Sequence, residues 1–347
     1  MQVSEPNTTV LSASEEYPFA GANPGDGWCE NYALVANDPD AGINLCLYLG
    51  RQPFDVSVWH EILLLSLPDG RVLVWKSAGR GRFEDGGGGA MVSFRCTDPG
   101  QRWAVALDGF TWETTAAALQ AGPFTDGPWT RTTIDLEFTA AMPPWILGNN
   151  DLENAWEHSH YEQLGRVTGA VRVDGEERTF AGTGHRDHSR GPRDFRSVLD
   201  HAWVNCLFPS GRGFALYRMR VPGGSDGVAV AGVYDGQTLR AAAVTSMPLL
   251  AEADDHDTYA LLLDVAGSPV RIQAEIMRSV GTVSYVTPNH MAIGTSSSAQ
   301  ACQVVSECGT RFIWDGEVGF GHTQRSSSSV ISPHHENPHH ENGSGTA

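Results

Sequence analysis

The feature that most constrains this chain is a series of short segments rich in Val, Ile, Leu, Phe and Tyr, each bounded by Gly, Pro, Asp or Asn. This pattern is typical of β-strands joined by tight turns. Turn sequences such as Pro68-Asp69-Gly70 and Asp174-Gly175 join them as hairpins. Only residues 112–120 offer a helical window. The expected strands are residues 61–67, 71–76, 90–96, 102–106, 132–138, 166–173, 202–208, 213–221, 227–234, 259–265 and 270–277.

Strands at this density, without long helices between them, predict an all-β fold of two antiparallel barrel or sandwich domains packed together. The 347 residues, 41% of them hydrophobic, are enough for two cores. We place an N-terminal domain at residues 1–147 and a C-terminal domain, which carries the charged motif described below, at 148–325, because residues 148–151 have the composition of a linker. Residues 326–347 hold a serine run and a duplicated Pro-His-His-Glu-Asn, and predict a disordered His- and Ser-rich tail.

The net charge of -18 argues against a protein that binds nucleic acid or anionic membranes. No apolar run approaches 18 residues, so no membrane span is expected. The first 19 residues lack the basic and apolar regions of a signal peptide, which favours a cytoplasmic protein with reduced thiols. The six cysteines contain no CxxC pair, so neither a zinc knuckle nor a redox dithiol is supported.

The densest group of ionisable residues is Gly-His-Arg-Asp-His-Ser-Arg-Gly-Pro-Arg-Asp-Phe at 184–195, followed by His201 and Trp203. So many acids, bases and fixed cations would repel or neutralise one another unless the fold held them in a defined network. This stretch is therefore the expected chemical centre. A buried polar network that only closes one end of a barrel is the structural alternative.

The same stretch carries a resemblance to a known family. His-Tyr-Glu-Gln at 160–163, Gly-Arg-Val-Thr-Gly at 165–169 and the run from 182 to 195 resemble the core of the AttH and hydroxyneurosporene synthase (carotenoid 1,2-hydratase) group. Arg190 stands where such proteins usually carry tryptophan. The resemblance implies a pair of lipocalin-related β-barrels. It also implies either enzymes that add water to a carbon–carbon double bond of an isoprenoid, or related barrels that steer cyclisations.

Hydration of an alkene requires a proton donor, a base for the attacking water and an apolar cavity. We expect Asp187, His188 and Asp194 to supply the acid–base chemistry. No nucleotide-binding motif is present, so no cofactor is expected. The residues expected to bind the substrate, with the aromatic ones lining one cavity, are His160, Tyr161, Arg193, His201, Trp203 and Tyr217.

Together with these residues, the resemblance implies a cofactor-free lyase of the hydratase, dehydratase or isomerase type, which acts on an apolar, isoprenoid-like small molecule. Two alternatives stay open. One is a cyclase that acts on a polyketide or terpenoid intermediate. The other is a non-catalytic carrier of a hydrophobic ligand, in which the charged residues only close the cavity.

Two smaller features complete the pattern. If Tyr161 lies on a strand, His160 and Glu162 face one side of it, and Tyr161 and Gln163 face the other. His185-x-Asp187 also matches two ligands of a facial iron site, with His201, His256, His290 or His322 as a third. With 13 histidines in the chain such a match arises by chance, so no metal is expected.

Overall fold

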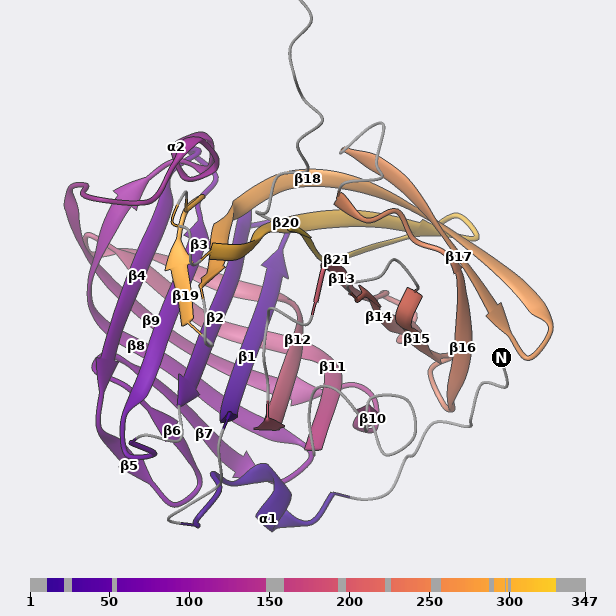
Figure 1. Cartoon of the computed structure of the whole chain (residues 1–347), viewed down its shortest axis with the longest axis horizontal. Coiled ribbons are helices and arrows are strands. Elements are labelled where there is room, and N and C mark those ends of the chain that lie inside the picture. Colours follow the sequence, from indigo (N-terminus) through magenta and orange to yellow (C-terminus); the bar gives the residue numbers. More distant parts are fainter. Residues whose placement is uncertain are drawn as a thin grey trace, which may run out of the picture.

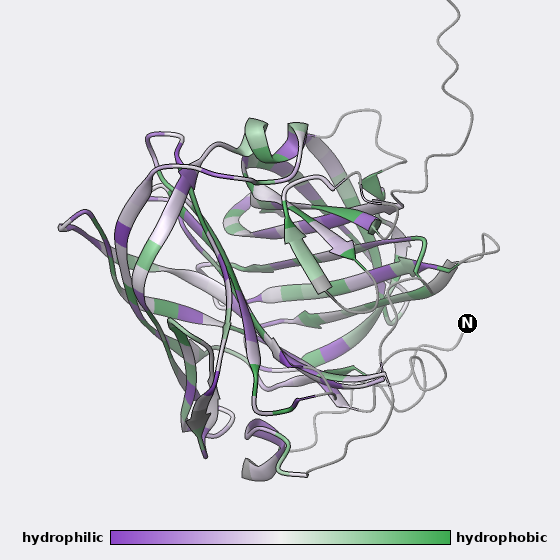
Figure 2. Cartoon of the chain, turned by 60° about the vertical axis from the view of Figure 1, so that its left-hand side comes forward, coloured by the Kyte–Doolittle hydropathy of each residue, from purple (hydrophilic) through white to green (hydrophobic). Residues whose placement is uncertain are grey.

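A computed structural model describes residues 11–21, 27–51, 55–147, 159–192, 198–221, 226–250, 257–286, 290–296, 298 and 301–328. Its strands follow the alternation of side chains in the sequence. In β9 (Trp129–Ala140), Ile134, Leu136 and Phe138 are buried, whereas Asp135 and Glu137 between them are exposed. Hydrophobic and hydrophilic residues alternate in this way along many strands of the molecule (Figure 2). This alternation is what a sheet with one apolar face requires.

The first sheet closes into an antiparallel barrel, here called barrel 1 (Figure 1). Its ring runs β11-β12-β1-β2-β3-β4-β8-β9 and returns to β11, and β10, β7, β6 and β5 extend it. The strands are β1 (Trp28–Asp38), β2 (Ile43–Arg51), β3 (Trp59–Ser66), β4 (Val72–Gly79), β5 (Gly81–Phe83), β6 (Gly86–Gly88), β7 (Val92–Asp98), β8 (Arg102–Thr114), β9, β10 (Trp145–Leu147), β11 (Ser159–Val173) and β12 (Glu176–Pro192).

The second sheet, here called barrel 2, contains the remaining strands. Its pairings run β17-β16-β15-β14-β13-β21-β20-β18, the β17–β18 pairing closes the ring, and β19 adds to β18. The all-β fold of two packed antiparallel barrels is thus confirmed. The strands are β13 (Asp200–Leu207), β14 (Gly213–Arg220), β15 (Asp226–Tyr234), β16 (Leu239–Ser246), β17 (Thr258–Val265), β18 (Ser268–Val286), β19 (His290–Ile293), β20 (Ala301–Trp314) and β21 (Glu317–Ser328).

The boundary between the two sheets differs from the expected domain boundary. It falls between Pro192 and Asp200 rather than at residue 147, because β11 pairs with β9 and β12 pairs with β1 to close barrel 1. The charged motif therefore belongs to barrel 1, not to the second sheet. The expected linker at 148–151 lies outside the described residues. The expected tail begins too early, because residues 326–328 pair with β20; the rest of it lies outside the described residues.

The described ranges contain two helices, and both are short. α1 (Ala13–Glu16) precedes barrel 1, and α2 (Ala116–Ala121) starts after Thr115, whose hydroxyl accepts a hydrogen bond from the backbone N–H of Ala118. Residues 112–114 of the expected helical window extend β8 instead, because they continue its pairing with β4. Among the described residues, no helix is both long and apolar enough to cross a membrane.

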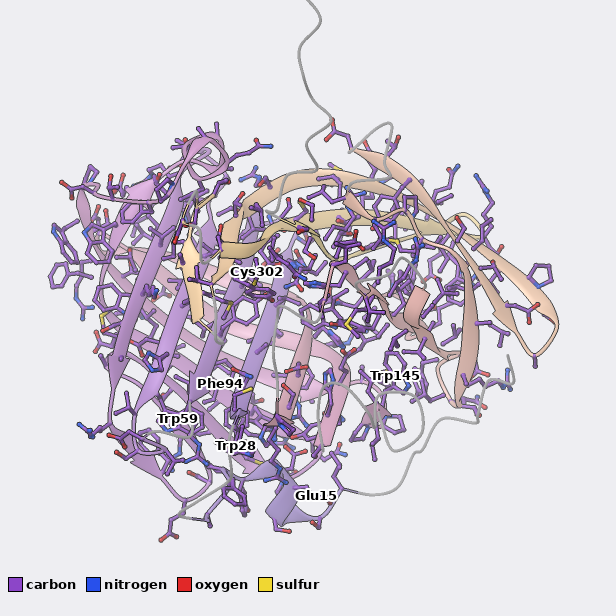
Figure 3. All side chains as sticks on the ribbon, viewed as in Figure 1. Glu15, Trp28, Trp59, Phe94, Trp145 and Cys302 are labelled. Carbon is purple, nitrogen blue, oxygen red and sulfur yellow. The ribbon has the colours of Figure 1, made fainter. Side chains whose placement is uncertain are left out.

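The described part of the chain packs around three apolar cores. One fills barrel 1 and includes Trp103 and Phe138, and a second fills barrel 2 and includes Phe214 and Phe312. The third lies between the barrels and joins residues from both, Trp145 and Trp203 among them. Side chains crowd both barrels and the space between them (Figure 3). This third core and the polar groups embedded in it form the inter-barrel seam.

Candidate functional site

The charged motif lies on the β11–β12 hairpin, whose turn at Asp174 and Gly175 takes the left-handed backbone conformation that its Asp-Gly sequence predicts. Because side chains alternate along a strand, the hairpin presents its polar residues in two opposite directions. Tyr161, Gln163, Arg186 and His188 point into barrel 1, whereas His160, Glu162, His185 and Asp187 point toward barrel 2. The expected division of residues 160–163 between two faces is thereby confirmed.

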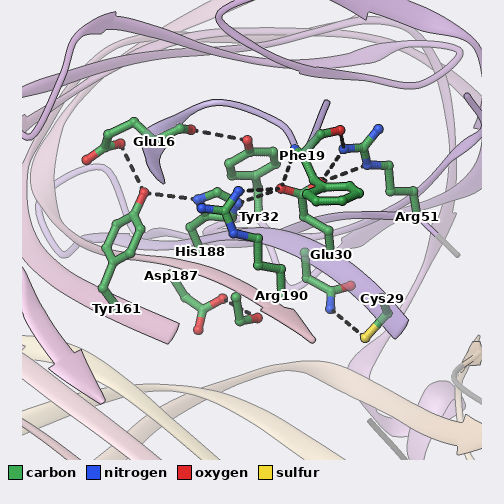
Figure 4. Close-up of polar contacts among 12 residues, drawn as sticks. Glu16, Phe19, Cys29, Glu30, Tyr32, Arg51, Tyr161, Asp187, His188 and Arg190 are labelled. Atoms are coloured by element: carbon green, nitrogen blue, oxygen red, sulfur yellow. Dashed lines mark hydrogen bonds and ion pairs between the residues drawn. The ribbon is translucent and has the colours of Figure 1, made fainter. Parts of the chain in front are cut away.

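The inward group forms a hydrogen-bonded chain inside barrel 1 (Figure 4). His188 Nε2 lies 3.0 Å from Glu30 Oε1, and His188 Nδ1 lies 3.1 Å from the Tyr161 hydroxyl. That hydroxyl donates to Glu16 Oε2 over 3.0 Å, and Arg186 donates to Glu16 Oε1 over 2.8 Å. Burial raises the pKa of Glu30, but the imidazole of His188 and the Arg51 guanidinium outweigh it and leave that pKa below its usual value.

Glu16 brings α1 across the end of barrel 1. Its carboxylate is fully buried and also accepts hydrogen bonds from the Trp103 indole at 2.9 Å and from the backbone N–H of Gly100 at 3.1 Å. The Tyr32 hydroxyl donates to the Glu16 carbonyl oxygen. The sequence signal did not identify Glu16 or Glu30, because each lies far along the chain from the motif that it contacts.

Tyr161, Arg186, His188 and the residues that they bond inside barrel 1 are here called the inward chain, and barrel 1 leaves little space beside it. The void bounded by Tyr32, Phe94, Trp103 and Arg186 measures about 10 Å³, which is close to what a single water needs. The two faces of β12 also separate Asp187 from His188, so the expected acid–base pairing of these neighbours is not formed. We therefore interpret the inward chain, His188 included, as a structural network that holds one end of barrel 1 closed.

The outward group forms a second cluster, at the edge of the inter-barrel seam. His160 Nε2 contacts Asp187 Oδ2 and lies 3.4 Å from Glu162 Oε1. His185 Nε2 lies 3.2 Å from Glu162 Oε2, and the Trp203 indole of barrel 2 donates to Glu162 Oε1 over 2.8 Å. We call His160, Glu162, His185 and Asp187 the seam cluster. Glu162 was not among the expected site residues although it lies within the 160–163 motif.

The electrostatics of the seam cluster determine the charges of His160 and Glu162. Burial lowers the pKa of His160, but the Asp187 and Glu162 carboxylates outweigh burial and raise it to about 10. Burial raises the pKa of Glu162, yet the imidazoles of His185 and His160 bring it down to about 2. At neutral pH the cluster therefore holds the His160 imidazolium beside the ionised Glu162 carboxylate. Asp187 is its most exposed member, with 13% of its side-chain surface accessible.

This charge pattern predicts the titration of His160. Its raised pKa stabilises the folded protein fully below pH 6.5, its ordinary value, and that contribution is lost as the pH rises through about 10. NMR of protein labelled at histidine, with the signal assigned by its absence in His160→Gln, should show an imidazolium that does not titrate between about pH 6 and 9. A midpoint near the ordinary value would contradict the ion pairing described here.

The other expected substrate-binding residues separate into two places. Trp203, His201 and Tyr217 lie on β13 and β14 of barrel 2 at the seam, where the His185 and Trp203 ring centroids are 4.9 Å apart. Tyr161 instead lies inside barrel 1, so these aromatic residues do not line a single cavity. His201 bonds Gln324 and Ser326, and burial lowers its pKa. Arg193 and Asp194 lie outside the described residues.

Two of the four possible third ligands of an iron site at His185-x-Asp187 lie among the described residues. His201 contacts Gln324 and Ser326, and His322 contacts Glu307, so neither joins His185 and Asp187. His256 and the His290 side chain lie outside the described residues. Ligand atoms of His160, Glu162 and Asp187 do lie within 4.8 Å of one another, and so do those of Cys46, Glu307 and His322.

Two antiparallel barrels joined by a partly polar seam define a two-domain, lipocalin-like protein. Residues 16–328 match the model of DUF7064, a domain of unknown function, and the chain belongs to this family. No curated protein sequence matches the chain.

Solved structures share the fold over most of their length. One is an AttH candidate from Nitrosomonas europaea, with 15% identity, a TM-score of 0.58 and coverage of 86% of this chain and 92% of that protein. Another is CghA, at 14% identity and a TM-score of 0.53, with 96% of each chain covered. A third is kievitone hydratase from Nectria haematococca, at 8% identity and a TM-score of 0.52, with 93% of this chain and 95% of that protein covered. The likeness expected from residues 160–195 is confirmed for the fold.

Proposed function

We propose that this protein is a cofactor-free enzyme of the hydratase or cyclase type, and that it acts on an apolar small molecule at the edge of the inter-barrel seam. The observation that supports this most is the seam cluster, in which the His160 imidazolium is held between two carboxylates beside an apolar surface. Trp145 and Trp203 belong to the buried apolar core on this side of the cluster. Perturbed ionisable groups of this kind are characteristic of reaction sites. Kievitone hydratase and CghA have a similar fold, and a reaction of the hydratase or cyclase type is compatible with that likeness.

The protonation state of the cluster narrows the chemistry. An imidazolium whose pKa is about 10 is too weak an acid to protonate an unactivated alkene readily. Its fixed positive charge can, however, stabilise negative charge that develops on a carbonyl oxygen. We therefore infer that the double bond of the substrate is conjugated to a carbonyl group, rather than being the isolated isoprenoid alkene expected from the sequence.

A hydration step then balances with this chain's own residues. The Asp187 carboxylate takes a proton from water as the water oxygen bonds to the β-carbon, and the electron pair of the double bond moves onto the carbonyl oxygen near His160. The resulting enolate takes the proton back from Asp187 at its α-carbon, which completes the addition of water. The reverse sequence is dehydration. Without water, the same polarisation of the carbonyl favours cyclisation, which is the second candidate reaction.

The alternative to an enzyme is a carrier that holds an apolar ligand and leaves it unchanged. Enzyme and carrier can be separated with the apolar metabolites of the protein's own host. The full chain is incubated with that extract, and the masses of the metabolites are followed by mass spectrometry. One species should decrease while another increases. Boiled protein, as the control, should leave both unchanged. A mass difference equal to water would indicate hydration or dehydration, and equal masses would indicate cyclisation or isomerisation. A molecule retained unchanged, with no such pair, would contradict the proposal.

A further inference from the structure

The inter-barrel seam contains a second polar cluster that the proposed reaction does not use. Cys46 on β2 faces Glu307 on β20 and His322 on β21, and one ligand atom from each lies within 4.8 Å of the other two. All three side chains are almost completely buried. We propose that Cys46, Glu307 and His322 bind a zinc-class divalent metal ion that ties barrel 1 to barrel 2.

The donor types support a metal of this class. Thiolate, imidazole and carboxylate are the three protein ligands that Zn²⁺ uses, and a soft sulfur donor disfavours Mg²⁺ and Ca²⁺. His322 Nε2 already lies 2.7 Å from Glu307 Oε2, so two of the ligands converge. The Cys46 thiol makes no hydrogen bond within the described part of the chain and faces them from the other barrel. Three protein ligands leave the fourth position of a tetrahedral site to water.

The charge of the cluster also favours a cation. Among the described residues, His322 is the only ionisable base that contacts the buried Glu307 carboxylate. The other partners of this carboxylate are the neutral Tyr48 hydroxyl and Gln324 amide, each at 2.8 Å. A buried carboxylate needs a positive partner. Burial and the neighbouring Glu307 raise the pKa of the Cys46 thiol well above its usual value, so metal binding must release its proton to solvent. The metal–sulfur bond replaces the sulfur–hydrogen bond, and nothing is oxidised.

The surroundings would hold the ligands in place. Tyr48 and Gln324 both donate to Glu307 Oε1, which orients the carboxylate and leaves Oε2 toward His322. Hydrogen bonds of this kind to a ligating carboxylate are a recurrent feature of metal sites. The Trp203 ring separates this cluster from the seam cluster, with centroids 4.9 Å from His185 and 6.1 Å from His322. The metal would therefore stabilise the seam without taking part in the proposed reaction.

Cobalt absorbance tests this site in the full chain. Co²⁺ bound to a thiolate gives a near-ultraviolet sulfur-to-cobalt charge-transfer band, and the His-rich segment 326–347 cannot produce one because it contains no cysteine. We expect metal-free, reduced protein to develop this band up to one equivalent of Co²⁺, and Zn²⁺ to remove it. The band should be absent in Cys46→Ser and retained in Cys308→Ser. Cys308 is the matched control because it is a second buried thiol, which lies on β20.

Two results would overturn the metal site. The first is a wild-type protein that binds Co²⁺ without the charge-transfer band, which would place the ion on nitrogen and oxygen ligands elsewhere. The second is a band of equal strength in Cys46→Ser. Circular dichroism shows whether each variant folds, and His322→Gln, which should weaken the band, provides a second test if Cys46→Ser does not fold. Neither result bears on the metabolite experiment, so the two proposals can fail separately.

Discussion

Replacing Asp187 by asparagine is expected to lower turnover by about 10²- to 10⁴-fold, the usual contribution of a general acid–base group. Asparagine keeps the shape of the side chain and can still accept a hydrogen bond from His160, but it cannot carry the proton between water and the α-carbon. The rate with the molecule identified from the host extract gives the measurement. Because Asp187 is the most exposed carboxylate of the seam cluster, we expect the variant to fold.

The matched control for this variant is Asp85→Asn. Asp85 is also a partly exposed carboxylate in an ion pair, with Arg95, but it lies in the turn between β5 and β6 of barrel 1, away from the seam. Its turnover should equal that of the wild type. Equal rates for Asp187→Asn and the wild type would exclude Asp187 as the proton carrier, and unfolding of Asp187→Asn would indicate that the seam cluster is structural.

Replacing Arg186 by methionine is expected to destabilise the protein by about 3–5 kcal/mol, because it leaves a buried carboxylate without its cation. Arg186 is 4% exposed and donates to both Glu16 and Gln163 inside barrel 1. Its guanidinium also lies 5.1 Å from the Trp103 ring centroid, so packing is lost as well. The free energy of unfolding in urea measures the effect.

A double-mutant cycle identifies the charge as the cause. Glu16→Gln removes the carboxylate charge and keeps its shape, so Arg186→Met combined with Glu16→Gln should cost less than the sum of the two single changes. Strictly additive free energies would mean that Arg186 and Glu16 do not interact as described. A loss below about 1 kcal/mol in Arg186→Met would remove the structural role assigned to the inward chain.

The alternation of strand residues accounts for what the sequence could predict about the site. It separates His160 and Glu162 from Tyr161 and Gln163, and the structure confirms that division. The same rule applied to 184–190 separates Asp187 from His188, whose proximity in sequence had suggested a joint role. β12 was not predicted as a strand because both of its faces carry charged side chains, which are buried only because partners from α1, β1, β11 and barrel 2 cover them.

Contacts between distant segments account for what the sequence could not predict. Glu16 and Glu30 complete the inward chain from α1 and β1, more than 140 residues before the motif. Cys46, Glu307 and His322 meet only because β2 of barrel 1 packs against β20 and β21 of barrel 2. No local pattern of hydropathy or spacing specifies such meetings, so the sequence predicted two barrels and the chemical motif but not which residues each barrel wall would bring together.

A crystal structure of Asp187→Asn with the reactive molecule bound tests the central claim most directly, because this variant should bind its substrate without converting it. We predict that the molecule lies at the edge of the inter-barrel seam, with its carbonyl oxygen toward His160 and its double bond beside residue 187. A molecule bound inside barrel 1 against Tyr161 and His188 would contradict the claim. So would one bound in the 330 Å³ surface groove of barrel 2 lined by Arg218, Thr245 and Met247.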